Sequence, residues 1–163
     1  MHPITTSFEA PSRGWAKPAP AILWGGLIAG TLDITAAFAT WGLRGVRPNR
    51  VLQGIASGLL GPAAFQGGAG TAALGAVLHF FIAFSAATVF YLASRKLPWL
   101  TQRAVLSGML YGAAVYLFMY WAVMPLSAVR RGPFTWAETI VAVITHLVCV
   151  GLPIALSVQR YAK

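Results

Sequence analysis

Three ionisable side chains lie inside long apolar stretches of the sequence, where a charge is costly. Asp33 occurs in AGTLDITAAF, His79 in GAVLHFF and His146 in VITHLV. An ionisable residue at the bilayer centre costs at least about 2.5 kcal/mol on insertion scales, so it normally faces a partner or a water-filled cavity. An imidazole beside a carboxylate can titrate close to neutral pH, which is the chemistry of a proton or ion relay.

These three residues are expected at one depth in the membrane. Counted from the side opposite the chain termini, Asp33 lies about ten residues inside its apolar run, His79 about eight and His146 about ten, which is roughly 12–15 Å. We therefore expect a buried polar cluster in which Asp33 pairs with one or both histidines. Such a cluster either fixes the helices in register or couples a proton or ion to transport.

A metal or haem site is the alternative interpretation of Asp33, His79 and His146. Two histidines and one carboxylate suit non-haem iron or zinc, and two histidines on opposite helices can ligate haem. No spacing fixes a coordination geometry, so no cofactor is expected, and a membrane-embedded redox enzyme remains the alternative. No serine, threonine or cysteine has a recognisable nucleophile motif around it, which favours a role without catalysis.

Composition indicates an integral membrane protein. Apolar residue classes make up 58% of the 163 residues and charged residues only 9%, whereas a soluble domain carries about 25% charged residues. The net charge of +9 comes from Lys and Arg scattered singly or in pairs between apolar runs. This pattern is typical of membrane-flanking residues, so the expected partner is the lipid bilayer and no nucleic-acid partner is expected.

Four apolar runs are long enough to cross a membrane, which takes about 20 residues. They cover approximately 20–43, 71–94, 103–125 and 136–158. We expect one transmembrane domain, 20–163, after a flexible tail, 1–19. Pro98 in the short link RKLPW makes the second and third runs an antiparallel hairpin. The predicted fold class is all-α, a polytopic bundle of four transmembrane helices.

A shorter helix, 49–60, is expected between the first two runs. Asn49 suits an N-cap, and the Gly-Pro pair that begins at Gly61 ends the pattern too early for a span. We expect an amphipathic helix that lies in the interface or re-enters the membrane, with its apolar face protected and Gln53 and Ser57 facing water. The apolar face comprises Val51, Leu52, Ile55 and Leu59.

Glycines indicate where helices approach one another closely. Gly26 and Gly30 form one GxxxG pair, and Gly108 and Gly112 form another. The first pair shares a stripe with Asp33, so the carboxylate is expected to face protein rather than lipid. Either pair can pack within the chain or against a second copy, which leaves a homo-oligomer or a larger membrane complex open as partners.

The start of the fourth run has a helix-start signature. Thr135 to Glu138, TWAE, fits a capping box, and a carboxylate there also favours the positive end of the helix dipole. Both residues are therefore expected at the rim of the bundle in a structural role. Pro153 should kink the same helix and free the carbonyl of Cys149 one turn earlier.

The cations predict an orientation. If both termini lie on one side, that side carries seven Lys or Arg, and the other side carries five. The excess favours cytoplasmic termini. The five on the other side are Arg44, Arg47, Arg50, Arg130 and Arg131.

Several short motifs lie between Gly75 and Arg160, namely GAVLHFF, VFYLASRKLP, LSGMLYGA and AETIVAVITHLVCVGLPIALSVQR. In this region the chain resembles the YagU-like family of bacterial inner-membrane proteins. The resemblance implies a small multi-pass protein of the bacterial inner membrane, of uncharacterised function, and its motifs include His79 and His146.

Overall fold

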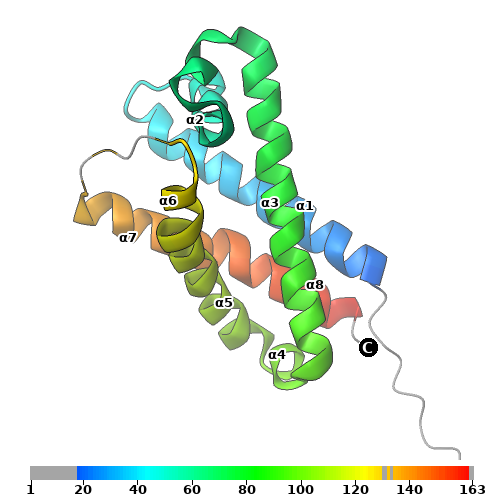
Figure 1. Ribbon diagram of the computed structural model, residues 1–163. Coiled ribbons are helices and arrows are strands. Elements are labelled where there is room, and N and C mark those ends of the chain that lie inside the picture. Colours follow the sequence, from blue (N-terminus) through cyan, green and yellow to red (C-terminus); the bar gives the residue numbers. More distant parts are fainter. Residues whose placement is uncertain (1–17, 130–131, 133, 162–163) are drawn as a thin grey trace, which may run out of the picture.

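The computed structural model describes residues 18–129, 132 and 134–161 (Figure 1). All regular elements among these residues are helical, which confirms the all-α prediction. Four helices are long and apolar enough to cross a membrane, and they coincide with the predicted runs to within a few residues. They are Pro18–Gly42, Gly68–Lys96, Ala104–Leu126 and Trp136–Tyr161. The predicted tail lies outside the described residues, except that Pro18 and Ala19 already belong to the first helix.

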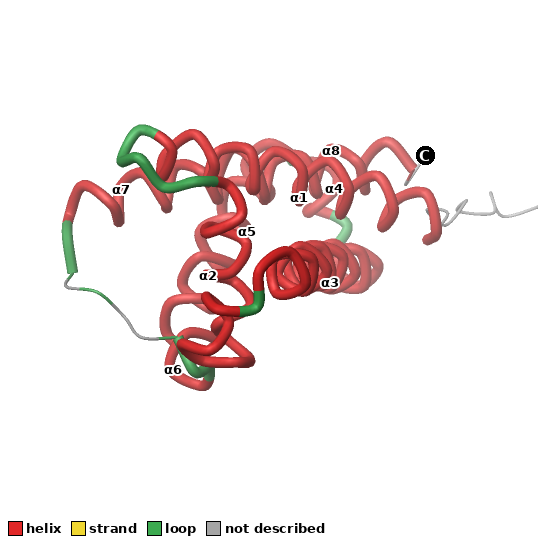
Figure 2. The backbone as a smooth tube through the Cα atoms, turned by 90° about the horizontal axis from the view of Figure 1, so that it is seen from above, coloured by secondary structure: helices red, strands yellow, loops and turns green. Residues whose placement is uncertain are grey.

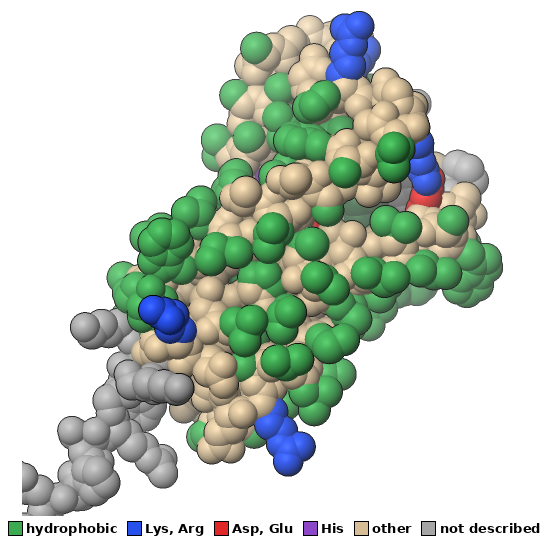
Figure 3. Space-filling view, turned by 180° about the vertical axis from the view of Figure 1, so that it is seen from behind, with side chains coloured by type: hydrophobic (Ala, Val, Ile, Leu, Met, Phe, Trp, Pro, Cys, Tyr) green, Lys and Arg blue, Asp and Glu red, His purple; other side chains and the backbone are tan. Residues whose placement is uncertain are grey.

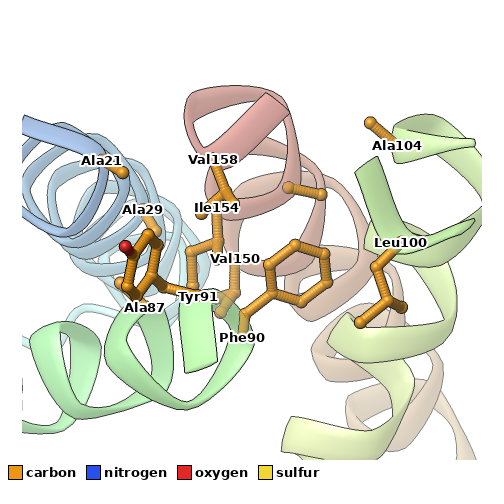
Figure 4. Close-up of a cluster of buried hydrophobic side chains, with 11 residues drawn as sticks. Ala21, Ala29, Ala87, Phe90, Tyr91, Leu100, Ala104, Val150, Ile154 and Val158 are labelled. Carbon is orange, nitrogen blue, oxygen red and sulfur yellow. The ribbon is translucent and has the colours of Figure 1, made fainter. Parts of the chain in front are cut away.

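The first helix, α1 (Pro18–Gly42), packs against both α3 (Gly68–Lys96) and α8 (Leu152–Tyr161). Figure 2 looks along α3 and shows α1 and α8 side by side in one layer, with α3 against that layer. The buried core lies mainly between these three helices, and Leu100, Ala104 and Val150 extend it toward the link after α3, the helix beyond that link and the segment before α8. Figure 4 shows Phe90 and Tyr91 of α3 close to Ile154 of α8 and to small alanines of α1.

The packing is inverted relative to that of a water-soluble bundle. Alanines such as Ala29 and Ala87 are fully buried, whereas Val77 and Phe81 are 67% and 68% exposed. Small residues between helices and large apolar residues outside are the arrangement expected when lipid is the solvent. The protein is therefore a multi-pass membrane protein.

Both GxxxG pairs pack against other helices of this chain, but they contact different kinds of atoms. A Cβ on Gly112 would collide with the carbonyl of His146, so here helix backbones touch directly. A Cβ on Gly108 would lie 2.9 Å from the carbonyl oxygen of Gly151. Gly26 and Gly30 instead make room for aromatic rings of α3, since Cβ atoms there would overlap Phe84 and Phe80.

Two of the spans contain a π-helical segment just before a proline. After α5 (Ala104–Phe118), the segment η2 (Met119–Val123) leads into α6 (Met124–Leu126). Likewise α7 (Trp136–Thr145) passes through η3 (His146–Gly151) into α8. Proline lacks an N–H and clashes with the carbonyl four residues earlier, and a wider turn relieves both problems. The distortion predicted from Pro153 thus takes the form of a π segment.

The short helix α2 (Pro48–Leu60) is present but begins differently from the prediction. Arg47, not Asn49, is the N-cap, with an extended backbone and no side-chain capping bond. Pro48 explains this difference, because proline suits the first helical position and disfavours a helical conformation in the residue before it. Gly61, at φ 59°, ends α2 as predicted, and the 3-10 helix η1 (Gly61–Gln66) follows. A short helix, α4 (Trp99–Gln102), occupies the link between α3 and α5.

The predicted orientation of α2 is wrong. Gln53 and Ser57, expected to face water, are only 3% and 6% exposed, whereas Leu59 is 65% exposed. Gln53 has a partner on α3, whereas the hydroxyl of Ser57 is satisfied within α2 itself. Nε2 of Gln53 donates to the carbonyl oxygen of Gly68 at 2.9 Å, and Ser57 donates to the Gly54 carbonyl at 2.6 Å.

Candidate functional site

Asp33 lies in the middle of α1 and is half-buried. Its carboxylate forms no hydrogen bond or ion pair with any residue that the structure describes. Every fully buried side-chain oxygen or nitrogen in that part of the chain has a hydrogen-bond partner. The unpaired oxygens of Asp33 therefore remain accessible from outside the packed helices.

His79 binds α1 close to Asp33 but does not bind Asp33 itself. Its Nε2 lies 2.8 Å from the carbonyl oxygen of Gly30. A carbonyl only accepts, so Nε2 carries the hydrogen in this contact. Gly30 is three residues before Asp33, and the bond therefore joins α3 to α1 one turn from the carboxylate. The ring also meets Phe80 edge-on, with centroids 5.4 Å apart.

His146 is satisfied within its own helix. Its Nδ1 lies 2.8 Å from the carbonyl oxygen of Ala142, to which it donates. The ring packs edge-on against Tyr116, with centroids 5.5 Å apart. The expected pairing of Asp33 with a histidine is therefore not formed, because a backbone carbonyl binds each imidazole instead.

Cys149 is the neighbour of Asp33 that sequence reasoning did not connect with it. The thiol is half-buried in η3, and the charge of Asp33 acts on it. Contact between α1 and η3 brings the two residues close. Cys149 lies four residues before Pro153. In the sequence, this proline is the feature that indicates a departure from α-helical geometry around Cys149.

The metal site considered as an alternative is not assembled in the part of the chain that the structure describes. No three His, Cys, Asp or Glu side chains within the described ranges are grouped closely enough to hold a metal ion. The physical reason lies in the imidazoles: those of His79 and His146 are directed to the carbonyls of Gly30 and Ala142. Asp33, His79 and His146 therefore do not form a three-ligand site for iron or zinc.

At the rim, Glu138 forms an ion pair in place of the predicted capping box. Thr135 is the N-cap of α7, but its side chain makes no capping bond. The carboxylate of Glu138 instead pairs with Arg44, whose guanidinium lies 5.0 Å from the ring centre of Trp41. A charged guanidinium is a stronger donor than the neutral backbone N–H of a cap.

Apart from Asp33, the charged side chains of the described residues lie toward the ends of the spans. Figure 3 shows apolar side chains over most of one face, with Lys and Arg at its margins. Comparison of the chain with family models, curated proteins and solved structures finds no match. The function is therefore inferred from the geometry around Asp33.

Proposed function

We propose that this chain is a small bacterial inner-membrane protein in which Asp33 reversibly binds a proton or a cation, either for transport or within a larger membrane complex. The observation that supports this role is the accessible, unpaired carboxylate halfway along an apolar span. The resemblance to the YagU-like family fits the same cellular location.

An unpaired carboxylate is unstable as an ion at this depth. The charged form costs at least about 2.5 kcal/mol at the bilayer centre, and a bound proton or cation removes that cost. The accessible side of Asp33 provides a route for the ion to arrive and leave. An accessible carboxylate within an apolar span is therefore suited to ion coupling.

The charge of the site favours a monovalent ion. Asp33 and Glu138 are the two acidic residues within the described ranges, and Arg44 neutralises Glu138 at the rim. One carboxylate balances one positive charge, so a divalent cation would leave an uncompensated charge in an apolar layer. We therefore propose a proton or an alkali cation as the ligand.

The distribution of cations supports an orientation with both termini in the cytoplasm. Arg95 and Lys96 lie in the last turn of α3, and Arg160 lies in the last turn of α8. These residues belong to the end of the bundle near the chain termini. Excess Lys and Arg in short loops favours the cytoplasmic side.

Ion flux into proteoliposomes tests the proposal. The purified protein is reconstituted with an internal pH-sensitive dye to follow protons or a sodium-sensitive dye to follow sodium, and flux is started by a gradient of the same ion. We expect flux with the wild type and loss of flux with Asp33→Asn. Glu138→Gln is the matched control, because it removes the other described carboxylate, which lies at the rim. Wild-type flux that survives Asp33→Asn would contradict an ion site at Asp33, and a wild type without flux would favour the accessory role.

A further inference from the structure

Three large apolar side chains are exposed on α2 and η1. Leu59, Leu60 and Phe65 are 65%, 42% and 41% exposed, and we call these three residues the outer edge. A helix that lies on a protein surface in water normally points such residues inward. In this segment Gln53 and Ser57 lie against the protein, Val51, Leu52 and Ile55 are half-buried, and Leu59 is exposed.

The outer edge is held rigidly in this orientation. A Cβ on Gly75 of α3 would collide with the carbonyl of Leu52, so the backbones of α2 and α3 are in direct contact. The hydroxyl of Thr71 donates to the carbonyl oxygen of Ala64 at 2.6 Å and thereby fixes η1 to α3. On another side, the N–H of Ala128 donates to the carbonyl of Gly58 at 2.9 Å. These contacts prevent α2 from rolling its apolar side inward.

Two exposed arginines lie at the start of α2, and one of them, Arg50, contacts the outer edge. Arg50 donates from Nη1 to the carbonyl oxygen of Phe65 at 3.1 Å, and its guanidinium lies 5.5 Å from the Phe65 ring centre. Arg47 lies at the start of α2 and is also exposed. Within the described residues, Glu138 is the acid at this end of the bundle, and it is paired with Arg44. Arg47 and Arg50 therefore present positive charge with no carboxylate partner in that part of the chain.

We propose that the outer edge lies in the boundary layer of the bilayer, where Arg47 and Arg50 contact the phosphates of anionic phospholipids. The location follows from connectivity, because α2 begins soon after α1 ends at the membrane boundary. Apolar side chains at this level enter the acyl region, and arginines extend to the headgroups. A guanidinium without an acidic partner can form charge-assisted hydrogen bonds with the phosphate of an anionic lipid, in whichever leaflet α2 lies. The inference is independent of ion binding at Asp33.

Spin labels test where the outer edge lies. Single cysteines are placed at Leu59, Phe65 and Asn49 in a Cys149→Ala background, and the labelled proteins are reconstituted in vesicles. Labels at Leu59 and Phe65 should collide with oxygen and not with a water-soluble nickel chelate, whereas the label at Asn49 should meet more of the chelate. Access of the chelate to the outer edge would place it in water. Protection from both reagents would mean that a second copy or another protein covers it, and either result overturns the proposal.

Lipid-dependent thermal stability tests the arginines. Phosphatidylglycerol added to the detergent-purified protein should raise its Tm, while phosphatidylcholine or inorganic phosphate should not. Arg47→Gln and Arg50→Gln should each raise, roughly five-fold, the lipid concentration that gives half of the Tm increase. The control pair Arg47→Lys and Arg50→Lys keeps the charges and should keep most of the effect. The proposal would be overturned if the Gln variants responded to phosphatidylglycerol as the wild type does. It would also be overturned if the Lys variants lost as much of the Tm increase as the Gln variants.

Discussion

The imidazole of His79 and the backbone carbonyl of Gly30 are 2.8 Å apart, and this contact ties α3 to α1 one turn before Asp33. His79 therefore positions the segment that carries the carboxylate without contacting the carboxylate itself. A hydrogen bond between transmembrane helices contributes about 0.6 kcal/mol on average, with a maximum near 1.7 kcal/mol. A hydrogen bond of this strength helps to hold one turn of α1 in place. It is also weak enough to break if α1 moves relative to α3.

Removal of the His79 imidazole should destabilise the bundle modestly. We expect His79→Leu to lower the free energy of unfolding by about 1 kcal/mol, because it removes a bond between helices. His146→Leu is the comparison, since that imidazole bonds within its own helix. Its effect should be smaller, as measured by denaturant unfolding in detergent micelles. A larger loss in His146→Leu would contradict the assigned roles.

Asp33 and His79 should behave as independent sites in a double-mutant cycle. The structure gives them no direct contact, so the effects of Asp33→Asn and His79→Gln on unfolding should add to within about 0.5 kcal/mol. The same expectation holds for Asp33→Asn with His146→Gln. Unfolding in detergent measures both cycles. A coupling energy well above that limit would show that the carboxylate and an imidazole interact after all.

The sequence predicts the spans well and the polar contacts poorly. Length and hydropathy determine which segments cross the membrane, and both can be read from residue types alone. The partner of an imidazole depends on helix rotation, and in this case backbone carbonyls of Gly30 and Ala142 occupy the place assigned to Asp33. Every residue has a backbone carbonyl, so the residue types do not indicate which carbonyl will accept the hydrogen bond of a given imidazole.

The orientation of α2 shows a second limit of sequence reasoning. The amphipathic pattern of 49–60 is real, but the prediction assumed that the polar side faces water. Gln53 instead donates to the backbone carbonyl of Gly68 at the start of α3, where residue types alone do not indicate a partner. In a membrane boundary layer the apolar side can face outward at no cost. Pattern alone gives the two faces of a helix and does not say which solvent each one meets.

Gly75 should be intolerant of any side chain. A Cβ there would meet the Leu52 carbonyl, which is backbone and cannot move aside, so we expect Gly75→Ala to destabilise the protein by about 1–3 kcal/mol or more. Gly54→Ala is the matched control on α2, since a Cβ at Gly54 meets nothing within 4 Å. It should be neutral or slightly stabilising because alanine favours helix. Thermal unfolding in detergent compares them, and equal effects would contradict the close contact of α2 with α3.

The ion pair between Arg44 and Glu138 should matter little for stability and should depend on salt. Both side chains are more than one third exposed, at 43% and 42%, so water and ions screen their attraction. We expect Arg44→Gln and Glu138→Gln each to lower the Tm slightly at low ionic strength. The double variant should be no worse than either single variant. All differences should shrink in high salt, and a large salt-independent loss would instead indicate a buried role.

The connectivity of the spans predicts which side of the membrane each loop faces. With four crossings, a reporter fused after Lys163 and one inserted at Gly132 should lie on opposite sides, because α7, η3 and α8 together form one span between them. A reporter after Leu97 should share the side of the C-terminus, since α5, α6 and the fourth span bring the chain back. Alkaline phosphatase and green fluorescent protein fusions distinguish periplasm from cytoplasm, and the C-terminal side should be cytoplasmic. The same side for Gly132 and Lys163 would remove the fourth span, and with it the position of Cys149 beside Asp33.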